Sequence, residues 1–443
     1  MLNFLAQTSG TLGYGVKEIA AIDLNLIGRL IRILIEGVGI VGVGIIVFTL
    51  ILKTIVLPLD IYSRIKTKKQ SLIMEKMRPQ MEKLQKQYAN DKQMYSQKVM
   101  ELQKKSGYSV FGACLPMLVS LVIFIIVFSA FSTYSQYANL NTYNNMVKVY
   151  NGVVAGYVYD EESDEGFLFE VKDENGNVVD YKVDCGLFAN SYNAEKKAAD
   201  SAYTELSEDD VFTALANEYK KEMGGYAASF DVSLVNEKDA GGNYTVTAES
   251  LRITLVNHYL ETPAALQVKE YYLEHNDSFL WVKNLWYPDS MLNREIPDFD
   301  KFKSTITKAS IGDDYRESYE KVTAALGEQK ETYNGYFVLI VLSIGFMLLQ
   351  QWISMRANKA VNDLSTVDGS GARTTKTMMI MMPIIYGLFS FFYSASFSIY
   401  MITNTIYSII TTLLINKLVD ISFRRKEERM ELSGFNRTTR NKK

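Results

Sequence analysis

The chain has 443 residues, 48% hydrophobic and 22% charged, values ordinary for a soluble protein of two to three domains. This average hides a segregation of charge, because residues 141–330 hold 18 Lys/Arg against 35 Asp/Glu while the remainder holds 29 against 15. Two histidines and two cysteines leave little material for a histidine metal site or a His-based catalytic triad, so metal-dependent hydrolysis is disfavoured.

Residues 1–37 form an N-terminal segment. The segment has no basic region followed by an apolar run, so it does not resemble a cleaved signal peptide, and the first membrane helix is expected to target the protein. In Leu24–Glu36 the charged residues recur three and four positions apart among Leu, Ile and Gly, which predicts an amphipathic helix lying in the membrane interface. The alternative is that these residues are merely the first turns of the next helix.

Five apolar stretches predict transmembrane helices, with expected boundaries at 38–59, 112–133, 335–355 and, for two helices in one hairpin, 378–418. A helix rises ~1.5 Å per residue, so about 20 residues cross a ~30 Å hydrocarbon layer. The fourth stretch, Met378–Phe392, is short. It is expected to pair with Phe397–Leu418 through a turn at residues 393–396, because a chain in lipid cannot leave its backbone unpaired. The sequence thus predicts a polytopic α-helical membrane protein.

Basic residues around these helices predict the orientation. The loops at 60–111 and 356–377 and the tail at 419–443 each hold about twice as many Lys/Arg as Asp/Glu. Cytoplasmic loops carry such an excess, so we expect these three segments in the cytoplasm. The N-terminus and the acidic segment 134–334 are then outside, and the C-terminus is cytoplasmic.

The cytoplasmic segment 60–111 is predicted to be a helical hairpin. Apolar residues recur at spacings of three and four after Pro79, and Asn90-Asp91 is a plausible turn into a second helix. Such a hairpin is either a solvated linker or a docking surface, and the basic candidates for docking are Arg78, Lys83 and Lys86.

The segment 134–334 is predicted to be an α+β domain. Alternating residues in Phe167–Val171 and Val178–Val183, with Asn175-Gly176 between them, indicate a β-hairpin. We expect another strand pair around Tyr244–Val256, and helices at Ala194–Lys221 and Lys301–Gln329.

Lys53 places an ammonium group inside the otherwise apolar first span. Burial in lipid costs several kcal/mol, so this side chain must snorkel, pair or face water. Snorkelling is one open reading, because Asp60 lies only about 10 Å further along the helix. The other is that Lys53 faces a wet groove, for which polar companions from three other spans are Ser120, Gln350, Gln351, Tyr400, Thr403 and Asn404. Each companion alone is more often a helix-packing residue.

Five motifs in chain order are similar to segments of one family: Lys53 ahead of Pro58-Leu59, Met77–Tyr88, Gly112–Met117, the set Phe279–Trp281, Asn284-Leu285 and Pro288-Asp289, and Met381–Ile384 with Tyr400–Asn404. Together they resemble the YidC/Oxa membrane insertases. The resemblance implies a five-helix insertase core around a hydrophilic groove, with a cytoplasmic helical hairpin that receives the substrate. It also implies that the positive charge of the groove attracts acidic residues of a nascent chain.

Three departures from that family are visible. The groove charge is usually arginine, whereas Lys53 is a point charge without the bidentate fork. The final hairpin turns through Ser394-Ala395-Ser396 in place of a Pro-Ala-Gly-like sequence. The long segment between the second and third spans has no counterpart at that position in Gram-negative relatives, so it is interpreted as an inserted extracytoplasmic domain of unassigned role.

The resulting hypothesis is a multi-pass insertase or chaperone of a bacterial plasma membrane that is not an enzyme and needs no cofactor. No Gly-rich nucleotide-binding loop occurs. Expected partners are nascent membrane proteins and the lipid bilayer. The ribosome, contacted through the basic tail, and the general secretion channel are further possibilities, and no DNA is expected. Rival hypotheses are a small-solute transporter or channel, which predicts an internal repeat that we do not find, and a receptor with an extracellular ligand-binding domain.

Overall fold

The computed structural model describes residues 16, 18–106, 110–172, 174, 176, 178–223, 231–357, 377, 381, 383–385, 387 and 391–440. The chain divides into two compact units. The helical unit comprises residues 23–138, 277–295 and 332–443, and the acidic unit comprises residues 1–22, 139–276 and 296–331.

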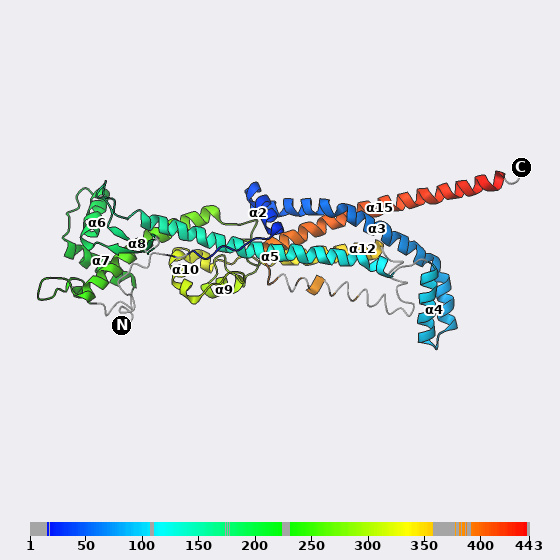
Figure 1. Cartoon of the computed structure of the whole chain (residues 1–443), viewed down its shortest axis with the longest axis horizontal. Helices are drawn as coiled ribbons and strands as arrows, with labels where there is room; N and C mark the ends of the chain where they lie inside the picture. The colour runs from blue at the N-terminus through cyan, green and yellow to red at the C-terminus, as the bar shows by residue number, and fades with distance from the viewer. Residues whose placement is uncertain are drawn as a thin grey trace. The chain divides into compact units, whose positions relative to one another are not determined.

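The helical unit is built from long helices: α2 (Leu26–Val38), α3 (Val41–Gln87), α4 (Lys92–Lys105), the first part of α5 (Val110–Ala155), α12 (Val338–Ala357) and α15 (Ala395–Arg440). Helix α15 packs against both α3 and α12 (Figure 1). Three stretches of the described residues are long and apolar enough to cross a membrane: Val41–Lys66, Val338–Arg356 and Ala395–Ser422. They correspond to the first, third and fifth predicted spans, which confirms a polytopic helical membrane protein.

The other two predicted spans are covered less completely. The second, residues 112–133, lies within α5, and the side chains of residues 110–121 fall outside the described part. Most of the fourth, Met378–Phe392, also falls outside it. Helix α15 begins at Ala395, and the amide of Phe397 donates to the carbonyl of Ser394 at 3.0 Å, so the last two residues of the predicted turn at 393–396 already belong to the helix. The hairpin of the fourth and fifth spans stays a prediction.

Helix α2 is amphipathic, as the sequence predicts. The side chain of Asn25 caps it by accepting from the amide of Gly28 at 2.8 Å. Ile31 is buried against the rest of the helical unit, whereas Leu26 and Ile33 are 76% and 65% exposed. The helix therefore has a second, unpartnered apolar side, which suits the predicted position in a membrane interface.

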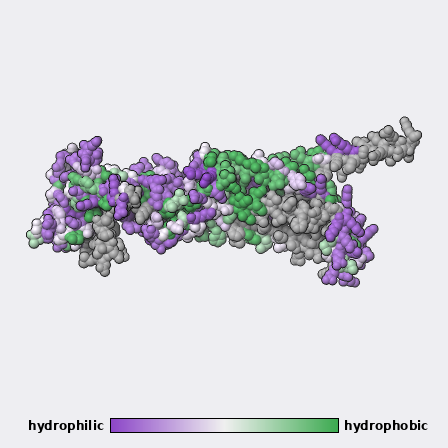
Figure 2. Space-filling view, viewed as in Figure 1, coloured by the Kyte–Doolittle hydropathy of each residue, from purple (hydrophilic) through white to green (hydrophobic). Residues whose placement is uncertain are grey.

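The predicted hairpin of 60–111 is formed by the last part of α3 and by α4. Asp91 caps α4 by accepting from the amide of Met94 at 3.0 Å. A small apolar core of Met77, Met81 and Val99 joins the two helices. The surface of this hairpin is hydrophilic, in contrast to the apolar surface over the upstream half of α3 (Figure 2).

A loop of the helical unit, residues 277–295, connects several of its helices, and we call it the tie loop. Ser135 of α5 donates to the carbonyl of Trp286 at 3.1 Å. The carbonyls of Tyr287 and Leu285 accept the amides of Ala395 and Ser396, each at 2.9 Å, so the start of α15 is held as well. The tie loop contains the motif Phe279–Asp289 on which part of the family resemblance rests.

Asp289 of the tie loop fixes the start of α12. Its carboxylate is 1% exposed and accepts the amides of Tyr336 at 2.7 Å and Leu339 at 2.6 Å. A carboxylate at a helix N-terminus also complements the helix dipole. The tie loop also packs closely against α3. The ring of Phe279 lies where a Cβ on Gly42 of α3 would be, so only glycine permits this approach.

The acidic unit combines one β-hairpin with helices. Strands β1 (Leu168–Lys172) and β2 (Val178–Val183) pair antiparallel, which confirms the predicted hairpin. The remaining elements are the end of α5, α6 (Cys185–Ala199), α7 (Glu208–Met223), η2 (Val232–Asn236), α8 (Val246–His275), α9 (Phe299–Thr305), η3 (Asp313–Tyr315), α10 (Arg316–Val322) and α11 (Gly327–Glu331). The predicted helices at 194–221 and 301–329 are thus each interrupted by loops.

The strand pair predicted around Tyr244–Val256 is wrong, because these residues begin α8. Their β-branched residues suggested strands, but Thr245 caps a helix by accepting from the amide of Ala248 at 3.2 Å. The buried apolar residues, which include Leu251 and Leu255, recur at helical spacing.

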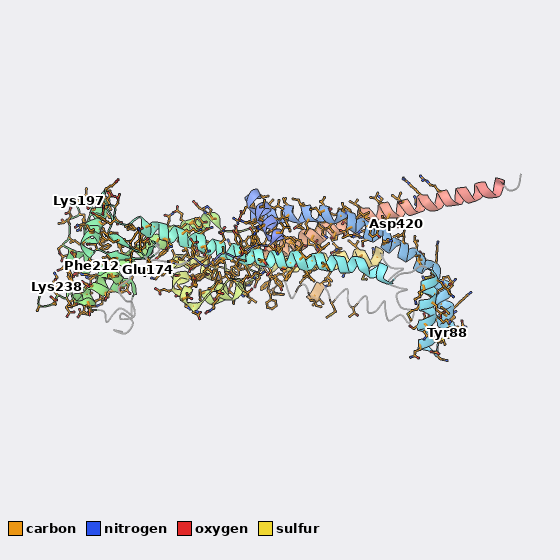
Figure 3. All side chains as sticks on the ribbon, in the orientation of Figure 1. Tyr88, Glu174, Lys197, Phe212, Lys238 and Asp420 are labelled. Carbon is orange, nitrogen blue, oxygen red and sulfur yellow. The ribbon has the colours of Figure 1, made fainter. Side chains whose placement is uncertain are left out.

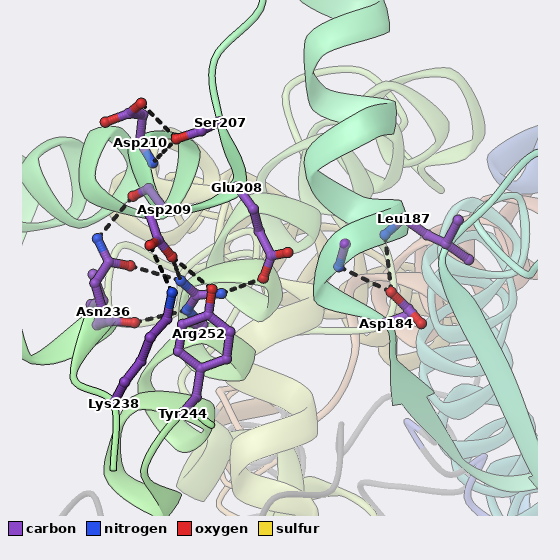
Figure 4. Close-up of polar contacts among 12 residues, drawn as sticks. Asp184, Leu187, Ser207, Glu208, Asp209, Asp210, Asn236, Lys238, Tyr244 and Arg252 are labelled. Atoms are coloured by element: carbon purple, nitrogen blue, oxygen red, sulfur yellow. Dashed lines mark hydrogen bonds and ion pairs between the residues drawn. The ribbon is translucent and has the colours of Figure 1, made fainter. Parts of the chain in front are cut away.

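A buried guanidinium organises this unit (Figure 4). Arg252 of α8 is 1% exposed and donates to the carbonyl of Val235 at 2.7 Å, to Asp209 at 2.6 Å and to the side-chain oxygen of Asn236 at 2.7 Å. It also pairs with Glu208. Each of its three nitrogens thus donates to an acceptor, so we interpret this cluster as structural.

Candidate functional site

Lys53 lies in α3, within the apolar stretch Val41–Lys66. Its side chain is half-buried, and no carboxylate of the described residues lies within ion-pair distance of it. Asp60 and Arg64 are the charged groups whose fields reach it. The first span thus carries a cation that the described fold leaves without an ion pair.

Three more charged residues continue from Lys53 along one face of α3. Asp60, Arg64 and Lys68 follow at intervals of seven, four and four residues, and such intervals place side chains on the same side of a helix. Lys53 and these three residues are all half-buried. A charged stripe therefore begins within the apolar part of α3 and continues just beyond its end.

Helix α15 lies against this stripe. Arg64 donates from Nη2 to Oγ1 of Thr412 at 2.6 Å, and Lys68 pairs with Asp420 at 2.6 Å. Figure 3 labels Asp420 on α15 and Tyr88 at the far end of α3. Buried hydroxyl groups recur on α15 at Thr405, Ser408, Thr411 and Thr412. We call the α3 stripe, with Thr412 and Asp420, the polar seam.

The sequence analysis missed most of the polar seam. It singled out Lys53 but not Arg64, Lys68 or Thr412. The seven-and-four spacing of charges downstream of Lys53 was the available signal, but Arg64 and Lys68 were counted only as basic residues of a cytoplasmic segment. Their pairing with α15 joins residues about 350 positions apart, which no local pattern contains.

The predicted companions of Lys53 are placed differently from one another. Tyr400 is buried in the apolar core, where its ring lies 5.2 Å from that of Phe131. Thr403 donates to the carbonyl of Ile399 in its own helix at 2.9 Å. Asn404 is half-buried on α15, as are Gln350 and Gln351 on α12, and the side chain of Ser120 lies outside the described part. The structure joins none of these described side chains to Lys53 by a hydrogen bond.

The predicted docking residues of the hairpin lie on its surface. Arg78 pairs with Glu82 one turn away at 3.2 Å, whereas Lys83 and Lys86 are exposed. Two methionines of α4, Met94 and Met100, are exposed as well. Flexible methionine side chains beside positive charge form a surface that adapts to apolar segments.

The tie loop adds one electrostatic feature. Burial raises the pKa of Asp277, and the indole N–H of Trp286, which donates to that carboxylate, acts in the opposite direction. Within the residues that the structure describes, no cluster of His, Cys, Asp and Glu has the arrangement of a metal site. The residues of the polar seam themselves offer charge and hydrogen bonds.

Sequence comparison identifies the family. A model of the family described as 60Kd inner membrane protein matches residues 33–153 and 264–422, well over half of the chain. The chain belongs to this family, the YidC/Oxa family. It is therefore a multi-pass protein of a bacterial membrane, and Lys53, the tie loop, α12 and most of α15 all lie in the matched part.

Relatives are similar over short stretches. A stretch of 69 residues is 44% identical to the membrane protein insertase YidC of Fusobacterium nucleatum, covering 16% of this chain and 32% of that protein. Matches to the insertases YidC of Clostridium tetani (38% over 65 residues, 15% and 28%) and Oceanobacillus iheyensis (33% over 81 residues, 18% and 31%) are similar in extent. The chain thus spans about a third or less of the curated relatives' length. No solved structure matches.

The family match leaves out residues 154–263. This stretch begins in the last turn of α5 and ends within α8, so it includes β1, β2, α6 and α7. The excess of acidic residues found in 141–330 and the Arg252 cluster therefore lie largely in a part that the family does not describe.

Proposed function

We propose that this protein is a membrane protein insertase that moves segments of nascent membrane proteins into the bilayer along the polar seam. The observation that carries the proposal is Lys53, a cation in an apolar helix without an ion pair among the described residues. Keeping a charge at such a position costs several kcal/mol, and intramembrane charges without structural partners are usually functional. Membership of the family and similarity to proteins named insertases support the same conclusion.

The mechanism follows from the physical chemistry of the seam. A polar segment of a nascent chain loses its water on entering lipid, and this loss is the main barrier to insertion. Lys53 and Arg64 offer positive charge to acidic side chains of the segment, and the hydroxyls of α15 offer hydrogen bonds. These groups replace part of the lost hydration while the apolar remainder partitions into lipid, which supplies the driving force. No nucleotide is needed.

In this proposal the hairpin of α3 and α4 lies in the cytoplasm and receives the substrate, while the acidic unit lies outside the cell. Exposed Lys83 and Lys86, with Met94 and Met100 of α4, provide a basic and adaptable surface for that contact. The basic tail is the candidate contact for ribosomal RNA.

Complementation of an insertase-depleted bacterium tests the role of Lys53. We expect wild type and Lys53→Arg to restore insertion of a small membrane protein with an acidic translocated segment. Lys53→Ala and Lys53→Glu are expected to lose at least about tenfold in insertion rate, equivalent to about 1.4 kcal/mol of lost stabilisation. Insertion is scored by protease protection of the substrate at equal expression of the variants.

Lys66→Ala is the matched control. Lys66 lies further along the same helix but is exposed and lies over the ring of Tyr62, so its loss removes the same charge outside the seam. If Lys53→Ala and Lys66→Ala insert the substrate equally well, the role assigned to Lys53 is wrong. If wild type itself fails to rescue, while the protein is present in the membrane, insertase activity toward that substrate is excluded.

A labelling experiment tests the orientation separately. Glu205 is exposed in the acidic unit, so Glu205→Cys in a chain with Cys114→Ser and Cys185→Ser offers one accessible thiol. An impermeant maleimide added to intact cells is expected to react with it. Reaction only after the cells are opened would place the acidic unit in the cytoplasm and overturn the topology.

A further inference from the structure

The acidic unit contains a cavity that the insertase proposal does not use. It lies between α6, α7 and α8, next to the turn that follows α5, and its volume is about 280 Å³. Residues 157 to 266 supply its walls, so the cavity lies largely in the stretch that the family does not match.

Three glutamates from two helices line this cavity: Glu195 of α6, and Glu218 and Glu222 of α7. Glu195 accepts a hydrogen bond from the hydroxyl of Tyr259 at 2.5 Å, and Glu222 lies 2.7 Å from Nε2 of His258. Among the lining residues, all of them within the described part, there is no lysine or arginine. His258 is the one lining side chain that can carry a positive charge, so three carboxylates against one histidine give the cavity an excess of acidic groups.

Aromatic rings form much of the remaining wall. Tyr157, Tyr219 and Tyr259 line the cavity, and the ring of His258 meets that of Tyr219 edge to face at 4.9 Å. Burial, together with nearby carboxylates, raises the pKa of Tyr157, of Tyr219 and of Tyr259, so these phenols are neutral at physiological pH. Neutral electron-rich rings beside carboxylates are the surroundings in which proteins bind organic cations.

Helix α8 adds a backbone acceptor. Pro263 lies inside α8 and has no N–H, so it cannot donate to the carbonyl of Tyr259, which is four residues earlier. Both residues line the cavity. A carbonyl without its helical donor is well suited to accept a hydrogen bond from an ammonium group.

A metal ion fits these walls poorly. Within the described residues, the carboxylates and histidine are not grouped closely enough to coordinate one ion. The volume is also larger than a bare ion fills, and apolar Leu215 and Leu255 complete the lining. An alkyl chain ending in a positive charge satisfies both the apolar and the acidic walls.

We propose that this cavity binds an alkylammonium group, supplied either by a lysine side chain of a polypeptide segment or by a free amine. An apolar strip beside the cavity distinguishes the two sources. Leu266 on the rim is 56% exposed, and Leu273, seven residues further on the same face of α8, is 49% exposed. A polypeptide with apolar residues next to its lysine would cover this strip, whereas a free amine would not.

Ligand-observed saturation-transfer NMR on the full chain in lipid nanodiscs tests the proposal. The probes are Nα-acetyl-lysine N-methylamide, butylammonium and, as a control, Nα-acetyl-norleucine N-methylamide, which keeps the alkyl chain without the charge. We expect the two cations to bind and norleucine not to bind. The double variant Glu218→Gln with Glu222→Gln should weaken cation binding at least about tenfold, the effect of removing charge-assisted contacts.

Glu205→Gln is the matched control, because Glu205 is an exposed glutamate of the same unit that pairs with Lys197 outside the cavity. It is expected to leave binding unchanged. Binding of norleucine equal to that of lysine, cation binding unaffected by the double variant, or no binding of either cation at about 10 mM would each overturn the proposal. Hydrogen exchange across α7 and α8 verifies that the double variant remains folded.

Binding of a peptide with leucine on both sides of one lysine distinguishes the two sources of the alkylammonium group. If it binds at least about tenfold more tightly than butylammonium, and Leu266→Ser removes that gain, the occupant is a polypeptide segment. Equal affinity assigns the cavity to a free amine. Both results retain the alkylammonium site, and the outcome is independent of whether the protein inserts substrates.

Discussion

The two units each hold a positively charged side chain away from bulk water, and they treat it in opposite ways. Arg252 of the acidic unit donates to two carboxylates, an amide and a backbone carbonyl, and lies over the rings of Phe212 and Tyr244. Lys53 of the helical unit has no ion pair among the described residues and lies in an apolar helix. The first cation is satisfied by the fold, whereas the second remains available.

This difference separates structural from functional charge. A buried ion whose partners are all present is costly to break but offers little to a ligand, because its bonds are already made. A cation without a partner adds nothing to folding and retains its full attraction for an incoming anion. The comparison therefore predicts large stability effects at Arg252 and small ones at Lys53, with the reverse order for activity.

Arg252→Ala is expected to have the largest effect on stability. It removes the ion-pair partner of Glu208, one of the three side chains that donate to Asp209, and the group on which α8 and η2 meet, so the acidic unit should lose about 3 kcal/mol. Hydrogen exchange of α7 and α8 in the full chain measures this loss. Arg316→Ala, which breaks the exposed pair with Asp300, should cost under about 1 kcal/mol. Equal effects of the two variants would contradict the structural role of Arg252.

Asp289→Ala tests whether a fully paired buried anion stabilises the fold as the fully paired cation Arg252 does. The variant leaves the amides of Tyr336 and Leu339 unpaired, so the start of α12 should lose about 2 kcal/mol, or about 30-fold in amide protection. Asp298 is an exposed cap of α9 whose carboxylate accepts from the amide of Lys301, and Asp298→Ala should cost about 1 kcal/mol. A smaller effect at Asp289 than at Asp298 would show that the tie loop does not hold α12.

Acid should weaken the acidic unit through Asp209. Burial alone raises the pKa of this group, but hydrogen bonds from Tyr244, Lys238 and Arg252 outweigh burial and lower its pKa. The stabilisation is therefore fully present above the unfolded pKa of about 3.9 and is lost as pH falls through the lower folded value. Urea unfolding at pH 3, 5 and 7, read by a dye at Glu205→Cys, measures the loss. Asp209→Asn should flatten this dependence, and an unchanged slope would rule Asp209 out as its source.

Lys53→Met should have the smallest effect on stability. Methionine fills a similar volume without a charge to desolvate, so the helical unit should change by less than about 1 kcal/mol, in the stabilising direction. All three tryptophans, Trp281, Trp286 and Trp352, lie in this unit, so thermal unfolding read by tryptophan fluorescence reports on it selectively. A loss as large as that at Arg252 would show that Lys53 is structural after all.

The sequence predicted the elements whose signals are local. Apolar length predicted the three spans found among the described residues. Three- and four-residue spacing predicted α2 and the hairpin of α3 and α4, and Asn175-Gly176 between alternating runs predicted β1 and β2. Each of these features is determined by residues within a few turns of one another. The error at Tyr244–Val256 arose where β-branched residues competed with the cap at Thr245.

The candidate site was only partly predictable, because it brings together residues that are far apart in the sequence. An ammonium in an apolar run is visible in a sequence, so Lys53 was found. Arg64 could be recognised only once α3 and α15 were placed side by side. The sequence also did not show that the ring of Tyr400 packs in the apolar core, and its role in a groove stays a prediction. Long-range packing decides which polar residues of a span face one another.

Helix α3 runs without interruption from Val41 to Gln87, about 70 Å at 1.5 Å per residue (Figure 1). Lys53 and one half of the hairpin therefore belong to one continuous helix, which bends before it enters the hairpin (Figure 1). Pro58 lies between Lys53 and Arg64 and removes one backbone hydrogen bond, so bending is easiest there. Under the proposed function, a chain that binds the hairpin would bend α3 near Pro58 and so change the spacing of Lys53 and Arg64 before the chain reaches the polar seam.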